Sequence, residues 1–206
     1  RRRSAARDEL PRGAPPDLSP TLHVEGSVPR PSSGPDRERR SAKKGNPMLA
    51  LTYRGPNRVR VEQRAEPKLE HPNDIILRVT RTAICGSDLH LLHGLIPDTR
   101  VGCVFGHEFA GVVEEVGSSV ASLTKGERVV IPFNIACGTC FFCQRGLTGN
   151  CENTNPNAGV ASGVYGYSHT TGGYDGGQAE DVRVPFADVG PMKSPEDMTD
   201  EEVLFL

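Results

Sequence analysis

The chain has 206 residues, enough for one domain or two small ones, and its 24 Lys and Arg residues nearly balance its 26 Asp and Glu residues. The charge is uneven, because residues 1–47 carry 11 basic and 6 acidic side chains whereas residues 48–206 carry 13 and 20. A mildly acidic main part argues against a nucleic-acid partner, since phosphate binding needs a basic face. No run of apolar residues approaches the roughly 18 that crossing a membrane requires, so we expect no membrane partner.

Residues 1–47 hold 8 of the 17 prolines and none of the Phe and Tyr residues. Such a composition buries too little apolar surface to offset chain entropy, so we predict a disordered N-terminal extension. The letters NPMLALTYRG are typical of a natural start at Met48, and we interpret residues 1–47 as an addition that is not native; a functional basic arm is the alternative. No apolar stretch follows the basic start and acidic residues recur, which argues against a secretion signal or a transit peptide. We therefore expect a cytoplasmic protein.

From Met48 onward, short β-rich runs alternate with turn signals such as GPN and EHPN. The predicted strands cover residues 48–54, 58–64, 74–85, 109–117, 127–133 and 177–185. Strands of this length and spacing predict a mainly β domain built as a small barrel. Helical patterns are limited to residues 87–94 and 199–206. The second opens with a capping box of Thr199 and Glu202 and ends in apolar residues that need a covering partner, so we expect a chain that is cut at this point.

Four of the six cysteines lie within fifteen residues, in the spacing C-x2-C-x2-C-x7-C: Cys137, Cys140, Cys143 and Cys151. Four thiolates form the tetrahedral site that structural zinc prefers. A bacterial iron–sulfur run would place its fourth cysteine after three residues and follow it with proline, and two disulfides conflict with a reducing compartment. We therefore predict a closed structural zinc site that stabilises a loop and performs no chemistry.

A second stretch carries ligands of another kind. Cys85 lies in ICGSDLH and His107 in FGHEFAGVVEEVG, and a Cys with a His can hold a catalytic zinc that keeps one position open. Taken alone the pair is a weak signal, because a lone Cys is usually a small buried residue, which is also what we expect of Cys103.

Three motifs in this order resemble the zinc-dependent medium-chain alcohol dehydrogenase family over residues 48–206. Residues 106–120 match its zinc signature, G-H-E-x2-G-x5-G-x2-V, and residues 85–90 match its active-site turn, C-G-S-D-x-H. The four-cysteine run matches its structural-zinc lobe, and GGQAEDVRVP resembles its returning strand. The stretches YGYSHTTGGYDGGQAE and VPFADVGPMK are most similar to the branch of glutathione-independent formaldehyde dehydrogenases and dismutases.

The resemblance implies a GroES-like, partly open β-barrel and a hydride transfer between a small alcohol or aldehyde and NAD or NADP. It implies that Cys85 and His107 bind the catalytic Zn2+, which acts as a Lewis acid that lowers the pKa of the alcohol. Glu108 would sit beside the metal, as a support or as an occasional ligand.

Three further residues receive roles from the same resemblance. Asp88 would hydrogen-bond the free ring nitrogen of His107 and fix its tautomer. Ser87 would take the proton of the alcohol, and His90 would pass it toward solvent. For Tyr165, Tyr167 and His169 in the YGYSH stretch, lining the substrate cleft and packing within the loop both remain open.

The third zinc ligand of the family and its Rossmann domain would follow residue 206, and no G-x-G-x-x-G occurs in the chain. We therefore expect residues 48–206 to form a catalytic domain that is truncated before the cofactor-binding domain and is inactive by itself. The full-length enzyme is expected to be a homo-oligomer.

Two other functions stay open. A zinc-ribbon-like binding module would need a basic or aromatic face near its metal, and Arg145 is the one basic residue within the cysteine loop. A family member without catalysis would serve a structural role. A third ligand followed by G-x-G-x-x-G beyond residue 206 would favour the enzyme.

Overall fold

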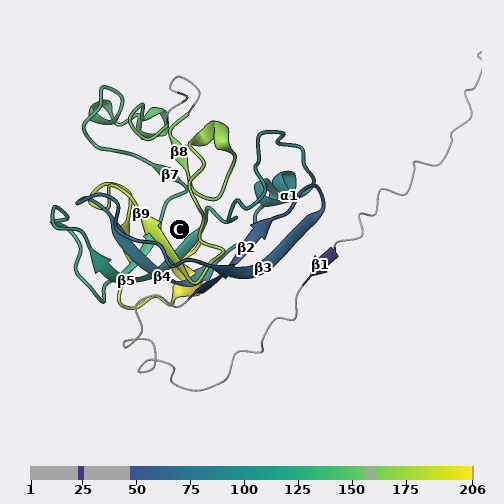
Figure 1. The fold of residues 1–206 in the computed structure, drawn as a ribbon. Helices are drawn as coiled ribbons and strands as arrows, with labels where there is room; N and C mark the ends of the chain where they lie inside the picture. The colour runs from purple at the N-terminus through teal and green to yellow at the C-terminus, as the bar shows by residue number, and fades with distance from the viewer. Residues whose placement is uncertain (1–22, 26–46, 156, 158–160, 206) are drawn as a thin grey trace, which may run out of the picture.

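A computed structural model describes residues 23–25, 47–155, 157 and 161–205. The strands are β1 (His23–Glu25), β2 (Met48–Tyr53), β3 (Arg58–Arg64), β4 (Ile75–Thr82), β5 (Phe109–Val116), β6 (Arg128–Ile131), β7 (Asn134–Ile135), β8 (Gly163–Val164), β9 (Asp181–Val184) and β10 (Met192–Lys193). The helices are α1 (Gly86–Leu92), α2 (Asp200–Val203) and three 3-10 turns, η2 (Cys143–Arg145), η3 (Thr148–Asn150) and η4 (His169–Thr171). The strands form three sheets, ordered β1-β3-β2, β10-β6-β5-β4-β9 and β7-β8 (Figure 1).

The five-stranded sheet carries the main core. Its pairs are all antiparallel, and its inner face buries Ile75, Leu77, Phe109 and Val113. β4 begins with three buried residues in a row, as expected of a strand that is covered on both faces. This core is the support on which both candidate metal groups are built.

The barrel is partly open. The N–H of Leu51 in β2 donates to Gln178 (2.8 Å), and the N–H of Glu180 donates back to Leu49 (3.0 Å). These bonds form an isolated bridge between Ala50 and Ala179. β2 and the segment before β9 are therefore joined at one point and do not form a continuous ladder. The predicted mainly β and partly open barrel is confirmed, and all six predicted strands are present, β3 with the predicted bounds and the other five with shorter bounds.

Ahead of Pro47 the structure describes one short segment. His23–Glu25 forms β1 and pairs in parallel with β3. The reason is that β3 would otherwise be an edge strand, whose free backbone groups accept any extended segment. The other residues of the range 1–46 lie outside the described part of the chain. The prediction that they are disordered stays a prediction.

One sequence-based expectation, the uncovered apolar face of α2, needs correction. Its capping box of Thr199 and Glu202 is present, but its apolar face is not without a partner. Val203 is fully buried against Ala110 and Val130 of the main sheet, while Phe205 remains 83% exposed. The helix therefore closes over the barrel within this chain.

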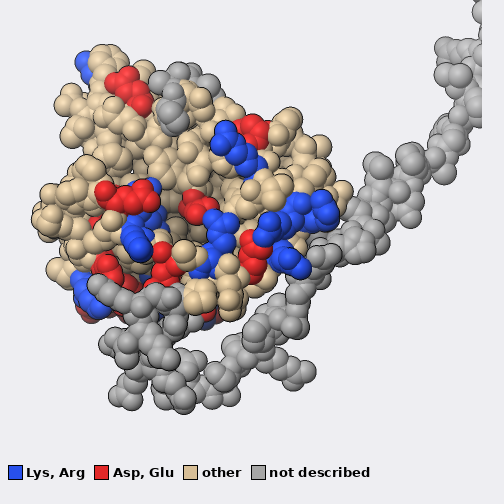
Figure 2. Space-filling model, viewed as in Figure 1, with Lys and Arg blue, Asp and Glu red and all other residues tan. Residues whose placement is uncertain are grey.

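The surface carries no single-sign face in the view of Figure 2, in which acidic and basic side chains are intermingled. Among the described residues, no helix is both long enough and apolar enough to cross a membrane.

Candidate metal centres

The four cysteines of the lobe converge. They come from the loop after β7, from η2 and from the end of η3, and their four sulfurs lie within 4.8 Å of one another. The sulfurs of Cys140 and Cys151 are 3.9 Å apart. That separation is too long for a disulfide, and it matches sulfurs that share a tetrahedral zinc at about 2.3 Å, which sit about 3.8 Å apart.

The backbone of the lobe points N–H groups at these sulfurs. Cys137 Sγ accepts from the N–H groups of Thr139 and Cys140 (3.4 Å each) and from Asn153 Nδ2 (3.4 Å). The N–H of Cys137 in turn donates to Cys151 Sγ (3.3 Å). Burial disfavours the Cys137 thiolate, but the hydrogen bonds from Thr139 and Cys140 outweigh it and lower the pKa of Cys137 to about 6. Since the thiolate is the form that binds metal, Cys137 is suited to a cation, whereas burial raises the pKa of Cys143 to about 12.

A second group of ligand atoms lies where α1 begins. Cys85 is the N-cap of α1, and its sulfur accepts the N–H of Ser87 (3.3 Å) while Asp88 Oδ2 accepts the N–H of Cys85 (2.9 Å). This capping box holds the thiol toward His107, whose Nε2 lies 3.1 Å from Cys85 Sγ. The thiol, the imidazole and the Asp88 carboxylate offer ligand atoms within 4.8 Å of one another.

Asp88 and His107 both keep an unused polar atom at this site. They are 4% and 7% exposed, and the 3.8 Å between Asp88 Oδ1 and His107 Nδ1 is too long for a hydrogen bond. Both atoms are buried and have no hydrogen-bond partner within the described part of the chain, and burial raises the pKa of Asp88. A His that binds metal through Nε2 needs an acceptor for its Nδ1–H, which Asp88 can become. The residues therefore fit a metal ion held by Cys85 and His107.

Two glycines of the G-H-E signature, Gly106 and Gly111, allow His107 to lie close to Cys85. Gly106, which precedes His107, has φ +100°, and a Cβ there would lie 2.7 Å from the backbone N of Gln178. A Cβ on Gly111 would lie 2.2 Å from the carbonyl oxygen of Arg78 in the neighbouring strand. Any larger residue at either position would displace the loop or the strand that carries His107.

The remaining predicted residues lie around this second group. Ser87 Oγ is 3.1 Å from Cys85 Sγ, and His90 is exposed in the last turn of α1. Glu108 is half-buried after His107, but in the described part of the chain the close set of ligand atoms includes Asp88 and not Glu108. The roles of these residues stay predictions.

The YGYSH stretch divides into separate environments. Tyr165 is 2% exposed and packs edge-on against Phe109, with ring centroids 5.3 Å apart, so it belongs to the core. Tyr167 packs edge-on against the ring of His107, with centroids 6.2 Å apart.

Sequence reasoning did not find the supporting roles of Thr139 and Asn153 in the cysteine lobe, because the positions between ligands carry no motif of their own.

A partly open β-barrel with a four-thiol lobe, in which a Cys at the start of a short helix faces a His that precedes β5, defines a class of zinc-binding domains. The family described as "Alcohol dehydrogenase GroES-like domain" matches residues 71–194. The chain belongs to this family, within the zinc-type medium-chain alcohol dehydrogenases.

Individual relatives agree with this family. The uncharacterized zinc-type alcohol dehydrogenase-like protein AdhB of Bacillus subtilis is 55% identical over 149 residues, which are 72% of this chain and 39% of that protein. A glutathione-independent formaldehyde dehydrogenase of Pseudomonas aeruginosa is 42% identical over 151 residues, 70% of this chain and 37% of that protein. The solved alcohol dehydrogenase TADH from Thermus sp. ATN1 has a TM-score of 0.71 and 44% identity, covering 77% of this chain and 43% of that chain. The chain thus spans about two fifths of the length of these relatives.

Proposed function

We propose that the chain is the catalytic domain of a zinc-dependent, NAD(P)-linked oxidoreductase that acts on a small alcohol or aldehyde. The observation that carries the proposal is the 3.1 Å approach of Cys85 Sγ and His107 Nε2, with a hydroxyl and a buried carboxylate beside them. A Cys and a His with room for further ligands suit a catalytic zinc, whereas the four closed thiols of the lobe suit a structural one. The nicotinamide cofactor, a homo-oligomeric state and a cytoplasmic location are proposed for the whole protein.

In this proposal each residue of the second group has one task. Cys85 and His107 bind the metal, and Asp88 orients His107 through Nδ1. Bound zinc supplies Lewis acidity that makes an alcohol hydroxyl more acidic, and a nicotinamide accepts hydride. Ser87 Oγ, 3.1 Å from Cys85 Sγ, takes the hydroxyl proton of the substrate. His90, exposed three residues further along α1, passes it to solvent.

Glu108 has a smaller part in the proposal, as an occasional ligand that exchanges with water. The 42% identity to a glutathione-independent formaldehyde dehydrogenase supports a short substrate such as formaldehyde or a small primary alcohol.

Cobalt titration of the 206-residue chain tests the ligand assignment. Co2+ replaces Zn2+ at thiolate sites and gives a thiolate-to-metal absorption band for each site that it fills. Cys85→Ala and His107→Ala are expected to remove the weaker of two filling steps and to keep the step that belongs to the lobe. Cys103→Ala is the matched control, because Cys103 is a buried thiol that belongs to neither group. Two unchanged steps in Cys85→Ala would refute the assignment.

A further inference from the structure

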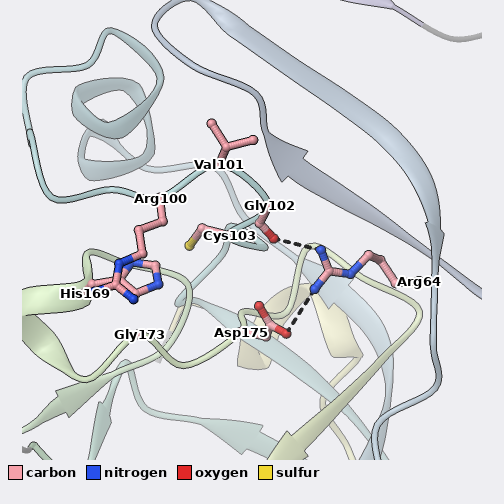
Figure 3. Close-up of a pocket in the computed structure, with 8 residues that line it drawn as sticks. All are labelled: Arg64, Arg100, Val101, Gly102, Cys103, His169, Gly173 and Asp175. Atoms are coloured by element: carbon pink, nitrogen blue, oxygen red, sulfur yellow. Dashed lines mark hydrogen bonds and ion pairs between the residues drawn. The ribbon is translucent and has the colours of Figure 1, made fainter.

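A pocket of about 270 Å³ opens where the end of β3 meets the loop before β5 and the segment around η4 (Figure 3). Its walls include Arg64, Arg100, Cys103, His169 and Asp175, and none of the seven cysteine and histidine residues predicted to bind or relay at the metal groups lines it. The pocket is therefore separate from both candidate metal centres.

Two guanidinium groups face this space from different segments. Arg64 is fixed in place, because one of its nitrogens donates to the carbonyl of Gly102 (2.9 Å) and another lies 3.9 Å from Asp175 Oδ2. Arg100 is exposed, and within the described part of the chain no hydrogen bond or ion pair engages its guanidinium. Figure 3 shows Arg100 and His169 on one side of the pocket and the Arg64–Asp175 pair on the other.

His169 contributes a polar atom without a partner. Its Nδ1 is buried and has no hydrogen-bond partner among the residues that the structure describes, which is costly for a ring nitrogen unless a ligand or solvent satisfies it. The ring lies over Gly173, where a Cβ would come within 2.8 Å of His169 Cδ2. The glycine thus leaves room for the imidazole at the wall of the pocket.

We infer that this pocket binds an oxyanion, the phosphoryl or carboxylate group of a small molecule. Among the side chains that line the pocket, two guanidinium groups and one imidazole face one carboxylate, and the nearby carboxylate of Asp98 is engaged by the N–H and the hydroxyl of Thr170 in η4. A guanidinium presents a planar fork of N–H donors that matches the oxygens of a phosphate or carboxylate. A volume of about 270 Å³ accommodates such a group together with a few attached atoms.

One layer of residues joins the pocket to the second metal group. Cys103 lines the pocket and its thiol donates to the carbonyl of Tyr167 (3.4 Å), and the ring of Tyr167 packs against His107. An anion bound to a metal at the second group would therefore lie close to an anion bound in the pocket. The experiment has to distinguish these two binding sites.

The test is a calorimetric titration of the 206-residue chain with inorganic phosphate and, separately, with acetate at constant ionic strength. We expect saturable binding of at least one of them and a change in the NMR signals of the His169 ring. Arg100→Gln is expected to weaken binding about tenfold or more, because it removes one charged donor. Arg145→Gln is the control, since Arg145 is exposed on the cysteine lobe, where it donates to the carbonyl of Phe141 and lies over the ring of the same residue.

The outcomes are distinct. Binding of phosphate alone identifies a phosphoryl site, and binding of acetate alone or of both identifies a site that takes carboxylates. Binding that persists in Cys85→Ala and weakens in Arg100→Gln belongs to the pocket and supports the inference whether or not the proposed catalytic role holds. Loss of binding in Cys85→Ala, an affinity unchanged in both Arg100→Gln and His169→Ala, or no saturation below ~10 mM of either anion would overturn it.

Discussion

Asp88 uses its two oxygens for two different purposes. Oδ2 accepts the N–H of Cys85 and completes the cap of α1, while Oδ1 faces Nδ1 of His107 without a hydrogen bond. A buried carboxylate with an unused oxygen is expensive on its own. The arrangement becomes favourable when Nδ1 of His107 carries a proton and donates it to Asp88 Oδ1. His107 takes this form when its Nε2 binds a metal.

Asp88→Asn separates the two purposes. An amide oxygen can still accept the N–H of Cys85, so the free energy of unfolding should change by less than about 1 kcal/mol. The charge that favours His107 as a ligand is lost, so affinity at the second metal group should fall about 10–100-fold. Cobalt titration measures this change.

Asp188→Asn provides the comparison. Asp188 is an exposed carboxylate that bonds the N–H groups of Ala121 and Ser122 on the surface, so its replacement should leave metal affinity unchanged. Equal effects of the two substitutions would mean that Asp88 serves only the fold.

At the scale of elements, α2 is held to the barrel by both apolar and charged contacts. Arg128 donates to Asp200 (2.6 Å) and to the carbonyl of Met198 (2.7 Å), and Val203 of the helix is buried against the main sheet. Burial opposes ionisation of Asp200, but hydrogen bonds from Thr80 and Arg128 outweigh it and lower the pKa of this carboxyl. The ion pair is partly exposed, so its contribution is about 0.5–1 kcal/mol.

This shift predicts that α2 loosens in acid. A carboxyl whose pKa is lower in the folded state stabilises the fold above its ordinary pKa of about 3.9, and the contribution is lost as the pH falls through the lowered value. Protection of residues 200–204 against hydrogen exchange should therefore drop below about pH 4, ahead of the central sheet. Asp200→Asn should show weak protection of α2 at neutral pH already; full protection there would exclude this role for the pair.

The cysteine lobe is a second element with its own stability. Its described residues form short turns and a two-stranded sheet, so its order depends on the four thiols and the metal that they are expected to hold. Cys143→Ala should lower the free energy of unfolding of the zinc-bound chain by a few kcal/mol, because a structural site with three ligands binds zinc much more weakly. Thermal unfolding with and without chelator measures the effect.

Cys103→Ala is the matched substitution for the lobe, since it removes a buried thiol outside the four-sulfur group. Cys103→Ala should lower the free energy of unfolding, but the loss of stability that the chelator causes should be the same as in the unsubstituted chain. A Cys143→Ala protein as sensitive to chelator as the unsubstituted chain would contradict a metal in the lobe.

The whole molecule shows which features a sequence reveals and which it hides. The strands follow from alternating residues, and the lobe follows from cysteines that are close in the chain, because both are local signals. Cys85 and His107 are 22 residues apart, and only the resemblance to a family joined them. The pocket is built from segments that are distant in sequence, which contribute Arg64, Arg100, His169 and Asp175. The burial of Val203 against the main sheet is also a contact between distant segments. No local sequence pattern predicts either feature.

The two ligand groups differ in strength, and this difference predicts how the 206-residue chain binds metal. The lobe offers four thiols, whereas the described part of the second group offers one thiol, one imidazole and one carboxylate. Because a complete tetrahedral thiolate site binds zinc more tightly than a site with fewer strong ligands, about one zinc per chain should remain after dialysis. A second should bind only at higher zinc concentration.

The same polypeptide contains no G-x-G-x-x-G fingerprint and spans 39% of the length of AdhB, so we expect these residues alone neither to bind NAD nor to oxidise alcohols. Metal analysis after dialysis, an NAD titration and an assay with formaldehyde and short alcohols measure all three properties. Two zinc ions that survive dialysis would show that the second group has a stronger ligand set than Cys85, His107 and Asp88 provide. NAD-dependent turnover would show that the cofactor is held by residues without the expected fingerprint, and would place the complete reaction within this chain.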